Sequence, residues 1–157
     1  MDNETKNALV MYEKLCKMLD ELELKYDKDP DQYVIECRIG GDDLPMNFFM
    51  RIHPKGEFVS LLSRLPITVP QDKILEVAVA ATYVNNMLVD GCFDLNIEKG
   101  TLLFRTTNFY KDSDISTEVL QYMLLVSHQT VERYNDKFFM MSKGMMSLTD
   151  FKAFADA

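Results

Sequence analysis

The sequence predicts an α+β fold in which an antiparallel sheet of about five strands is flanked by helices, in the order α-β-β-β-α-β-β-α. Apolar residues first recur at helical spacing and then alternate with polar residues in three segments between residues 33 and 66. After a very apolar segment they alternate again on both sides of a Lys-Gly pair. Helical and strand periods grouped in this way are typical of α+β proteins. We expect a single domain, residues 1–157.

The first element is predicted to be an amphipathic helix over about residues 4–24. Its apolar residues recur every three or four positions, and charged residues occupy the positions between them. Asp29 precedes Pro30 and is disfavoured in the α conformation, so we expect "DKDPDQ" to break this helix. The predicted buried stripe consists of Leu9, Tyr12, Leu15, Cys16, Leu19 and Leu22.

Three alternating segments then predict three strands joined by short polar turns, as in an antiparallel meander. We expect the third strand to end at Pro66, because proline has no N–H group to donate to a neighbouring strand. The three segments are "YVIECRIG", "MNFFMRIHP" and "EFVSLLSRLP".

The most apolar part of the chain predicts a helix over residues 70–88. Pro70 suits the first helical position, and Asp72 suits the positive end of the helix dipole. The apolar positions cover much of the circumference of this helix. Such a helix either lies at the centre of the fold or is covered by a partner.

Two strands are predicted around Lys99-Gly100, with two alternatives for the loop between them. A two-residue loop pairs Leu95 with Phe104 in the core and Asp94 with Arg105 outside. A three-residue loop with Gly100 in the left-handed region avoids a positive φ at Lys99, but it shifts the pairing by one residue. We favour the first pairing because it keeps the charged residues on one face.

The last part of the chain predicts a long helix and a short terminal helix. Ser116 is a suitable N-cap with Glu118 in the first turn, Gly144 ends the helix or its loop, and Ser147 is a suitable cap for "SLTDFKAFA". The buried stripe of the long helix is predicted to contain Leu120, Met123, Leu124, Val131, Tyr134 and Phe138.

Composition and charge argue against several classes of partner. The net charge is −8, from 17 Lys plus Arg and 25 Asp plus Glu. Too few basic residues remain unopposed by acidic ones to form a face that binds a nucleic-acid backbone. The charged residues in the N-terminal segment exclude an uninterrupted signal sequence, and no apolar run is long enough to cross a membrane. The three cysteines form no C-x-x-C pair and suit buried positions in a reducing compartment, so we expect a cytoplasmic protein.

Candidate reactive residues are few, and we predict no catalytic, cofactor-binding or metal-binding residues. The two histidines are far from each other and from the cysteines in sequence, which disfavours a metal site. Cys92 and His128 could meet in space as a nucleophilic pair, but apolar neighbours would raise the pKa of the Cys92 thiol. We predict that Asp94 and Arg105 form a structural ion pair, and that Asp114 belongs to the loop before Ser116.

A methionine-rich segment near the C-terminus is the remaining candidate for a site. Four of the 11 methionines lie within residues 140–146, next to two phenylalanines. A flexible thioether surface accepts different apolar partners, so this segment either packs on the protein's own sheet or contacts a protein partner. The candidate contact residues are Phe138, Phe139, Met140, Met141, Met145 and Met146.

The element order, together with "AATYVNNMLVDGCFDLNIEKGTLLFRT" and "STEVLQYMLLVSHQTVERY", resembles the YbjN-like family. Its members are named as candidate bacterial sensory transduction regulators. The resemblance covers about residues 10–140 and depends on scaffold features: Asn85-Asn86 at a helix end, Gly100 in a turn, and Arg105. It implies a type III secretion chaperone-like fold, found in small acidic dimers, and it implies binding rather than catalysis. It brings no catalytic residues to this chain.

The function that we expect is therefore a non-enzymatic regulatory or adaptor module that binds a protein and forms a homodimer. The partner is unidentified, and we expect no cofactor and no nucleic-acid or membrane partner. One alternative is a secretion-type chaperone that binds an extended protein client. Another is a small-molecule-binding protein or an enzyme that uses Cys92, His128 or Arg105.

Overall fold

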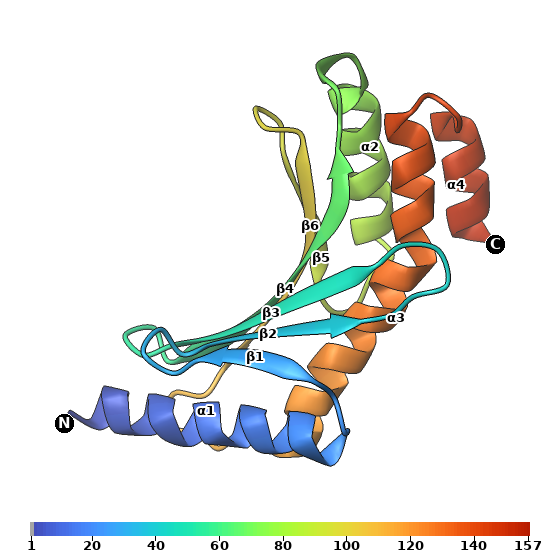
Figure 1. The fold of residues 1–157 in the computed structure, drawn as a ribbon. Coiled ribbons are helices and arrows are strands. Elements are labelled where there is room, and N and C mark those ends of the chain that lie inside the picture. The colour runs from blue at the N-terminus through green and yellow to red at the C-terminus, as the bar shows by residue number, and fades with distance from the viewer. Residues whose placement is uncertain (1) are drawn as a thin grey trace.

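The computed structural model describes residues 2–157, and these residues form four α-helices, a short 3₁₀-helix and one six-stranded antiparallel sheet (Figure 1). The predicted α+β class is confirmed, and the sheet has one strand more than the five expected. The helices are α1 (Asn3–Glu21), η1 (Gln71–Lys73), α2 (Ile74–Asn85), α3 (Thr117–Ser142) and α4 (Leu148–Asp156). The strands are β1 (Tyr26–Asp29), β2 (Val34–Ile39), β3 (Met46–His53), β4 (Phe58–Thr68), β5 (Cys92–Asn96) and β6 (Thr101–Phe109).

The additional strand is β1, in a segment that we expected to be a break. Its sequence "YDKD" has no apolar alternation, because β1 is an edge strand with three exposed residues. It pairs only with β2 among the described strands, from Tyr26 opposite Cys37 to Asp29 opposite Val34. Backbone pairing alone therefore makes it a strand, and hydrophobic periodicity cannot reveal such an element.

The strand order in the sheet is β1-β2-β3-β4-β6-β5, so β4 and β6 pair although α2 and β5 lie between them in sequence. The prediction that the third strand ends at Pro66 is wrong, because β4 continues to Thr68. The pairing of β4 with β6 shifts register between Arg64 and Thr68, which indicates a bulge at this place. A bulge tolerates a proline that cannot donate a ladder hydrogen bond.

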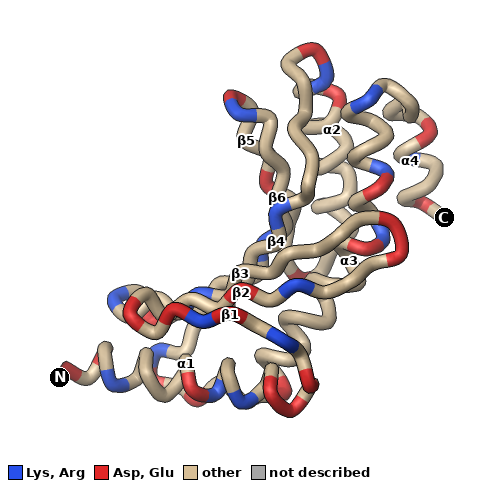
Figure 2. Tube along the Cα trace, viewed as in Figure 1, with Lys and Arg blue, Asp and Glu red and all other residues tan. Residues whose placement is uncertain are grey.

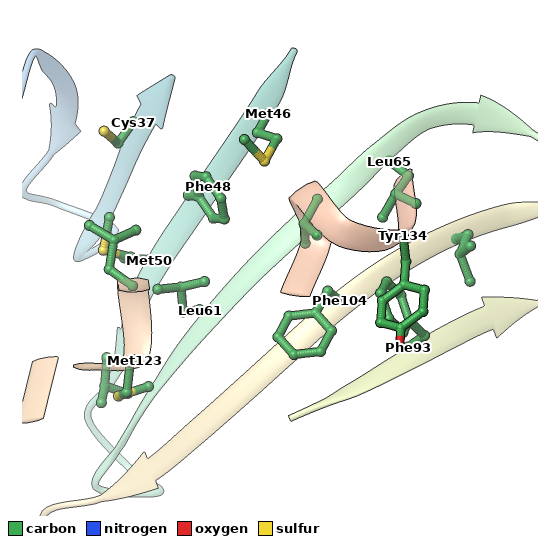
Figure 3. Packing of buried hydrophobic residues seen from close by; sticks show 14 of the residues in the cluster. Cys37, Met46, Phe48, Met50, Leu61, Leu65, Phe93, Phe104, Met123 and Tyr134 are labelled. Carbon is green, nitrogen blue, oxygen red and sulfur yellow. The ribbon is translucent and has the colours of Figure 1, made fainter. Parts of the chain in front are cut away.

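The helices lie on one side of the sheet, as Figure 1 shows, with α1 at the β1–β3 end, α2 and α4 at the other end, and α3 running between them. The strand residues that face these helices form the core together with the helix stripes (Figure 3). All six residues of the predicted α3 stripe are buried. In α1, Tyr12, Leu15 and Leu19 of the predicted stripe are buried, whereas Leu9 is exposed.

The helix predicted from Pro70 begins later, at Ile74, and ends at Asn85. Pro70 instead caps the 3₁₀-helix η1, with φ −68° and ψ 155°. One face of α2 is buried, whereas Leu75 is 81% exposed and Val79 is 50% exposed. The helix is therefore covered by its own chain on one side and open on the other.

The β5–β6 hairpin has a four-residue loop, Ile97 to Gly100, so both predicted registers are wrong. Leu95 lies opposite Leu102, and Asp94 lies opposite Leu103. The side chain of Asn96 determines this turn: its Oδ1 accepts hydrogen bonds from the backbone N–H groups of Glu98 (3.1 Å) and Lys99 (2.9 Å). A shift of two residues from the favoured register keeps the side chains of the paired residues on their predicted faces, whereas Ile97 lies in the loop and is 60% exposed.

The predicted helix caps are confirmed. The Ser116 hydroxyl accepts a hydrogen bond from the backbone N–H of Val119 at 3.3 Å, and Ser147 accepts one from Asp150 at 3.1 Å. Gly144 follows α3 with φ +70°, a conformation that suits glycine. Within residues 2–157, no helix is both long enough and apolar enough to cross a bilayer.

Candidate functional site

The face of the sheet that points away from the helices is the main candidate site, and we call it the outer face. The register places its residues on paired positions of neighbouring strands, and most of them are partly or fully exposed. None of the four helices in residues 2–157 is drawn on this side (Figure 1). On β2 to β6 it carries Val34, Glu36, Arg38, Asn47, Phe49, Arg51, His53, Phe58, Ser60, Leu62, Arg64, Cys92, Asp94, Leu103, Arg105, Thr107 and Phe109.

Apolar side chains run across the middle of the outer face. Phe49 lies opposite Leu62, and Leu103 lies opposite Arg64 on the next strand pair. They line an open groove of about 490 Å³, which we call the outer groove. An antiparallel sheet with one solvated face normally carries polar residues there, so this apolar row is an unusual feature. The groove is lined by Asn47, Phe49, Leu62, Arg64, Leu65, Pro66 and Leu103.

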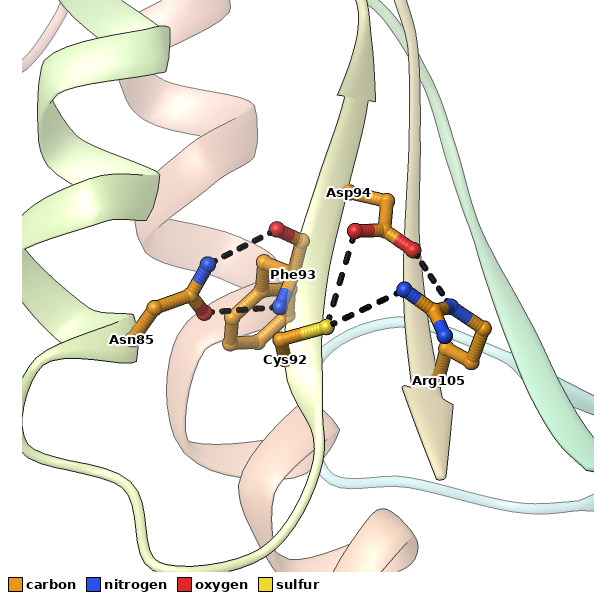
Figure 4. A network of polar contacts seen from close by, with 5 residues as sticks. All are labelled: Asn85, Cys92, Phe93, Asp94 and Arg105. Carbon is orange, nitrogen blue, oxygen red and sulfur yellow. Dashed lines mark hydrogen bonds and ion pairs between the residues drawn. The ribbon is translucent and has the colours of Figure 1, made fainter. Parts of the chain in front are cut away.

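Asp94 and Arg105 meet at the β5 side of the outer face (Figure 4). Arg105 Nε donates to Asp94 Oδ2 at 2.7 Å, although the two residues are diagonal neighbours and Cys92 is the residue opposite Arg105. The two side chains are 44% and 43% exposed. An ion pair with this much solvent contributes only about 0–1 kcal/mol to stability.

Cys92 completes this cluster but is poorly suited to act as a nucleophile. Its Sγ lies 3.5 Å from Asp94 Oδ1 and 3.7 Å from Arg105 Nη2. Burial raises the pKa of the Cys92 thiol, Asp94 raises it further, and Arg105 only partly opposes them. At neutral pH the group is therefore a thiol rather than the reactive thiolate.

The structure does not bring Cys92 and His128 together. Cys92 lines a pocket of about 280 Å³ with Arg105 and Tyr122, whereas His128 lines a different one with Leu24. All three cysteines are free thiols. No group of three or more His, Cys, Asp or Glu residues in residues 2–157 is arranged to hold a metal ion.

Asn85 has a role that the sequence did not reveal. Its side-chain Nδ2 donates to the Phe93 carbonyl at 2.9 Å, and its Oδ1 accepts from the Phe93 N–H at 2.7 Å (Figure 4). Phe93 is in the edge strand β5, so the side-chain amide takes the place of a neighbouring strand there. The sequence shows that Asn85 lies eight residues before Phe93, but it does not show that the two residues are in contact.

The methionine-rich segment is divided between the core and the surface. Phe138 and Met141 are fully buried, and the Phe138 ring lies 5.0 Å from the rings of both Phe93 and Phe151. Phe139, Met140 and Met146 are half-buried, and Met145 is 66% exposed. Asp114 lies in the loop before α3, where it forms an ion pair with Lys14.

Comparison with known proteins identifies the fold. No family model and no curated protein sequence matches the chain. A structure of YbjN from E. coli, described as a candidate transcription regulator, is similar with a TM-score of 0.58 at 10% identity, over 79% of this chain and 87% of that one.

Two complexes contain similar chains. A chain of the HopA1–SchA chaperone–effector complex has a TM-score of 0.56 at 14% identity, over 87% of this chain and 98% of that one. A chain of the ExsC–ExsE complex has a TM-score of 0.59 at 12% identity, over 87% of this chain and 96% of that one. The chain therefore has a YbjN-like, type III secretion chaperone-like fold, and at these identities the likeness concerns the fold alone.

Proposed function

We propose that this chain is a non-enzymatic regulatory or adaptor module that binds a protein partner on its outer face. The observation that carries the proposal is the apolar groove around Phe49, Leu62 and Leu103, on a sheet face that has no covering helix layer in residues 2–157. Apolar side chains grouped on an open surface mark interaction sites, because their burial by a partner is favourable.

The chemistry of the cluster at the β5 side supports binding rather than catalysis. The pKa of the Cys92 thiol is raised, and the Arg105 guanidinium is already bound to Asp94. These groups lack an activated nucleophile with an adjacent base. Free thiols also suit a reducing compartment, and we propose a cytoplasmic location on this ground.

The experiment is a co-purification of the tagged full chain from native cells, followed by mass spectrometry. We expect one stoichiometric partner with the wild type and its loss with Leu62→Ser/Leu103→Ser. The matched control is Val89→Ser/Leu125→Ser, which removes exposed apolar side chains outside the outer face. A partner that both double variants retain would refute the outer-face proposal, as would the absence of any stoichiometric partner. Thermal unfolding of each variant would verify that it folds.

A second candidate function is a secretion-type chaperone for an extended client, which the similarity to a chain of a chaperone–effector complex supports. The two functions differ in the fate of the partner. Deleting a chaperone should lower the amount of its client and stop its export, whereas deleting an adaptor should leave the partner's amount and location unchanged.

We also propose that the chain forms a homodimer through the open side of α2. Leu75 and Val79 are one helical turn apart, so they form a continuous exposed apolar patch. Their burial against a second copy would complete the coverage of a helix that is apolar almost all round.

A further inference from the structure

We propose that the partner of the outer face is an acidic, extended segment of another protein, in which two carboxylates flank an apolar residue. The apolar residue would enter the outer groove, and the carboxylates would pair with arginines on either side of it. This inference rests on the proposed function and names the chemistry of the partner.

Arginine is concentrated on the outer face. The chain has five arginines, and four of them are on the outer face, at one polar position each of β2, β3, β4 and β6. On β3, β4 and β6 the face carries three arginines and no carboxylate. Its acidic residues are on β1, β2 and β5, and one of them, Glu36 on β2, lies opposite Phe49. A chain with a net charge of −8 therefore has a basic centre on this face.

Two of these arginines remain available to bind a partner. Arg105 binds Asp94 at 2.7 Å, and Arg38 lies 3.5 Å from Glu36. Arg51 and Arg64 are exposed and form no ion pair with any described residue. A guanidinium is well suited to bind a carboxylate through two parallel hydrogen bonds.

Arg51 and Arg64 lie on either side of the apolar pair formed by Phe49 and Leu62. Phe49 and Leu62 face each other across β3 and β4; Arg51 follows Phe49 by two residues, and Arg64 follows Leu62 by two residues. Because the strands are antiparallel, the two arginines lie on opposite sides of the apolar pair. Their separation along the strands is four residues, or about 13 Å. An extended partner that presents acid, apolar and acid side chains at positions i, i+2 and i+4 matches this spacing, because alternate residues face one side.

Other occupants fit these observations less well. A single-stranded nucleic acid needs continuous positive charge, but Glu36 and Asp94 border the basic centre and the lining of the groove is largely aliphatic. A second copy that placed an acidic surface on this face would make a head-to-tail contact, which propagates into open assemblies unless it closes into a ring. A separate acidic protein segment has neither difficulty.

The test is selection of a displayed library of random short peptides on the immobilised full chain. We expect enriched peptides to share acid–x–apolar–x–acid, and Arg51→Gln/Arg64→Gln to weaken their binding by at least about tenfold. High salt should weaken binding to the wild type more than binding to this variant, because the variant lacks the charges that salt screens. The control, Lys6→Gln/Lys111→Gln, removes the same charge from exposed positions elsewhere and should leave binding unchanged. Unfolding midpoints equal to that of the wild type would show that both variants are folded.

Several outcomes would overturn the inference. These are enriched peptides that are neutral or basic, equal binding by the arginine variant, no enrichment at all, or displacement of the peptides by single-stranded RNA of mixed sequence. The partner captured from cells separates this inference from the proposed function. If Leu62→Ser/Leu103→Ser releases it but Arg51→Gln/Arg64→Gln does not, the outer face binds a protein and the acidic partner is wrong.

Discussion

Gly100, in the β5–β6 hairpin, lies against Val69, the residue that follows β4. Its φ is +69°, and a Cβ atom built there would lie 2.2 Å from the carbonyl oxygen of Val69. The Gly100 carbonyl also accepts a hydrogen bond from the Val69 N–H at 2.8 Å, so neither backbone can move away without losing a contact. Glycine is required here for two separate reasons, conformation and space.

We therefore expect Gly100→Ala to lower the free energy of unfolding by more than about 2 kcal/mol, since it combines a left-handed backbone with a steric clash. Urea denaturation would measure the loss. Gly40→Ala is the matched control, because no atom lies within 4 Å of a Cβ atom at Gly40. It should change stability by no more than about 0.5 kcal/mol. Equal losses for the two variants would show that the close approach to Val69 has no energetic importance.

Sequence reasoning at the residue scale succeeded where a side chain acts on its own backbone neighbourhood. Ser116 and Ser147 were predicted as caps because the chemistry of a cap is complete within four residues. Asn85 was not predicted as an edge cap, since its partner Phe93 is reached only once α2 and β5 are placed side by side. The Asn96 turn was missed although its partners are local, because the Lys99-Gly100 pair suggested a shorter loop.

At the scale of elements, Asn85 connects the end of α2 to the edge of β5. Without its amide, the Phe93 N–H and C=O would be left unpaired at the edge of a sheet, where such groups can pair with another chain. We expect Asn85→Ala to destabilise the fold by about 1–3 kcal/mol, the cost of leaving such groups without partners, and to increase aggregation. Urea denaturation and light scattering at raised temperature would measure the two effects.

Two variants control this prediction. Asn86→Ala removes the same side chain from an adjacent exposed position and should change stability by no more than about 0.5 kcal/mol. Asn85→Asp keeps an acceptor for the Phe93 N–H but replaces the donor by a carboxylate oxygen that repels the Phe93 carbonyl, so we expect a clear loss of stability. If Asn85→Asp and Asn85→Ala were both as stable as the wild type, the amide would have no role at the edge.

The elements themselves were predictable to the extent that each shows a hydrophobic period. The faces of the paired residues of β5 and β6 were correct, because alternation determines which side chains point inward, whereas Ile97, expected on the apolar face, lies in the loop and is exposed. Its register was wrong by two residues, because alternation repeats every two residues and only the turn determines which repeat is used. β1 has no apolar alternation, and the bulge at Pro66 depends on pairing with the distant strand β6, so neither could be read from the local sequence.

At the scale of the whole molecule, the distribution of charge over the surface says more about the partner than the net charge does. Figure 2 shows acidic and basic positions in loops and along strands alike, whereas on β3, β4 and β6 the charged residues of the outer face are all arginines. The net charge of −8 argued against a polyanionic partner, but a sum over the whole chain does not show that arginines are grouped on the outer face. Each arginine was visible in the sequence at a polar position of its strand. The strand order that unites them, and the lack of a helix on that face in residues 2–157, were not.

The open side of α2 gives the last prediction, which concerns assembly. Leu75 and Val79 are highly exposed, and burying these two side chains against a second copy would be favourable because it removes apolar surface from water. We expect sedimentation equilibrium to give the wild type a mass of twice 18.2 kDa. Leu75→Glu/Val79→Glu should weaken the dimer by at least about 30-fold, since it places two charges at the centre of the proposed interface.

The control for this prediction is Val89→Glu/Leu125→Glu, which adds the same charge at exposed apolar positions outside α2 and should leave the dimer intact. A wild type that sediments as a monomer at micromolar concentration would refute the dimer. A dimer that persists in the α2 variant would place the interface elsewhere, and Met145 in the loop before α4 would then be the next residue to substitute. The outer face lies on the other side of the sheet from the main helix layer, so an α2 dimer would leave it free on each protomer to bind a partner.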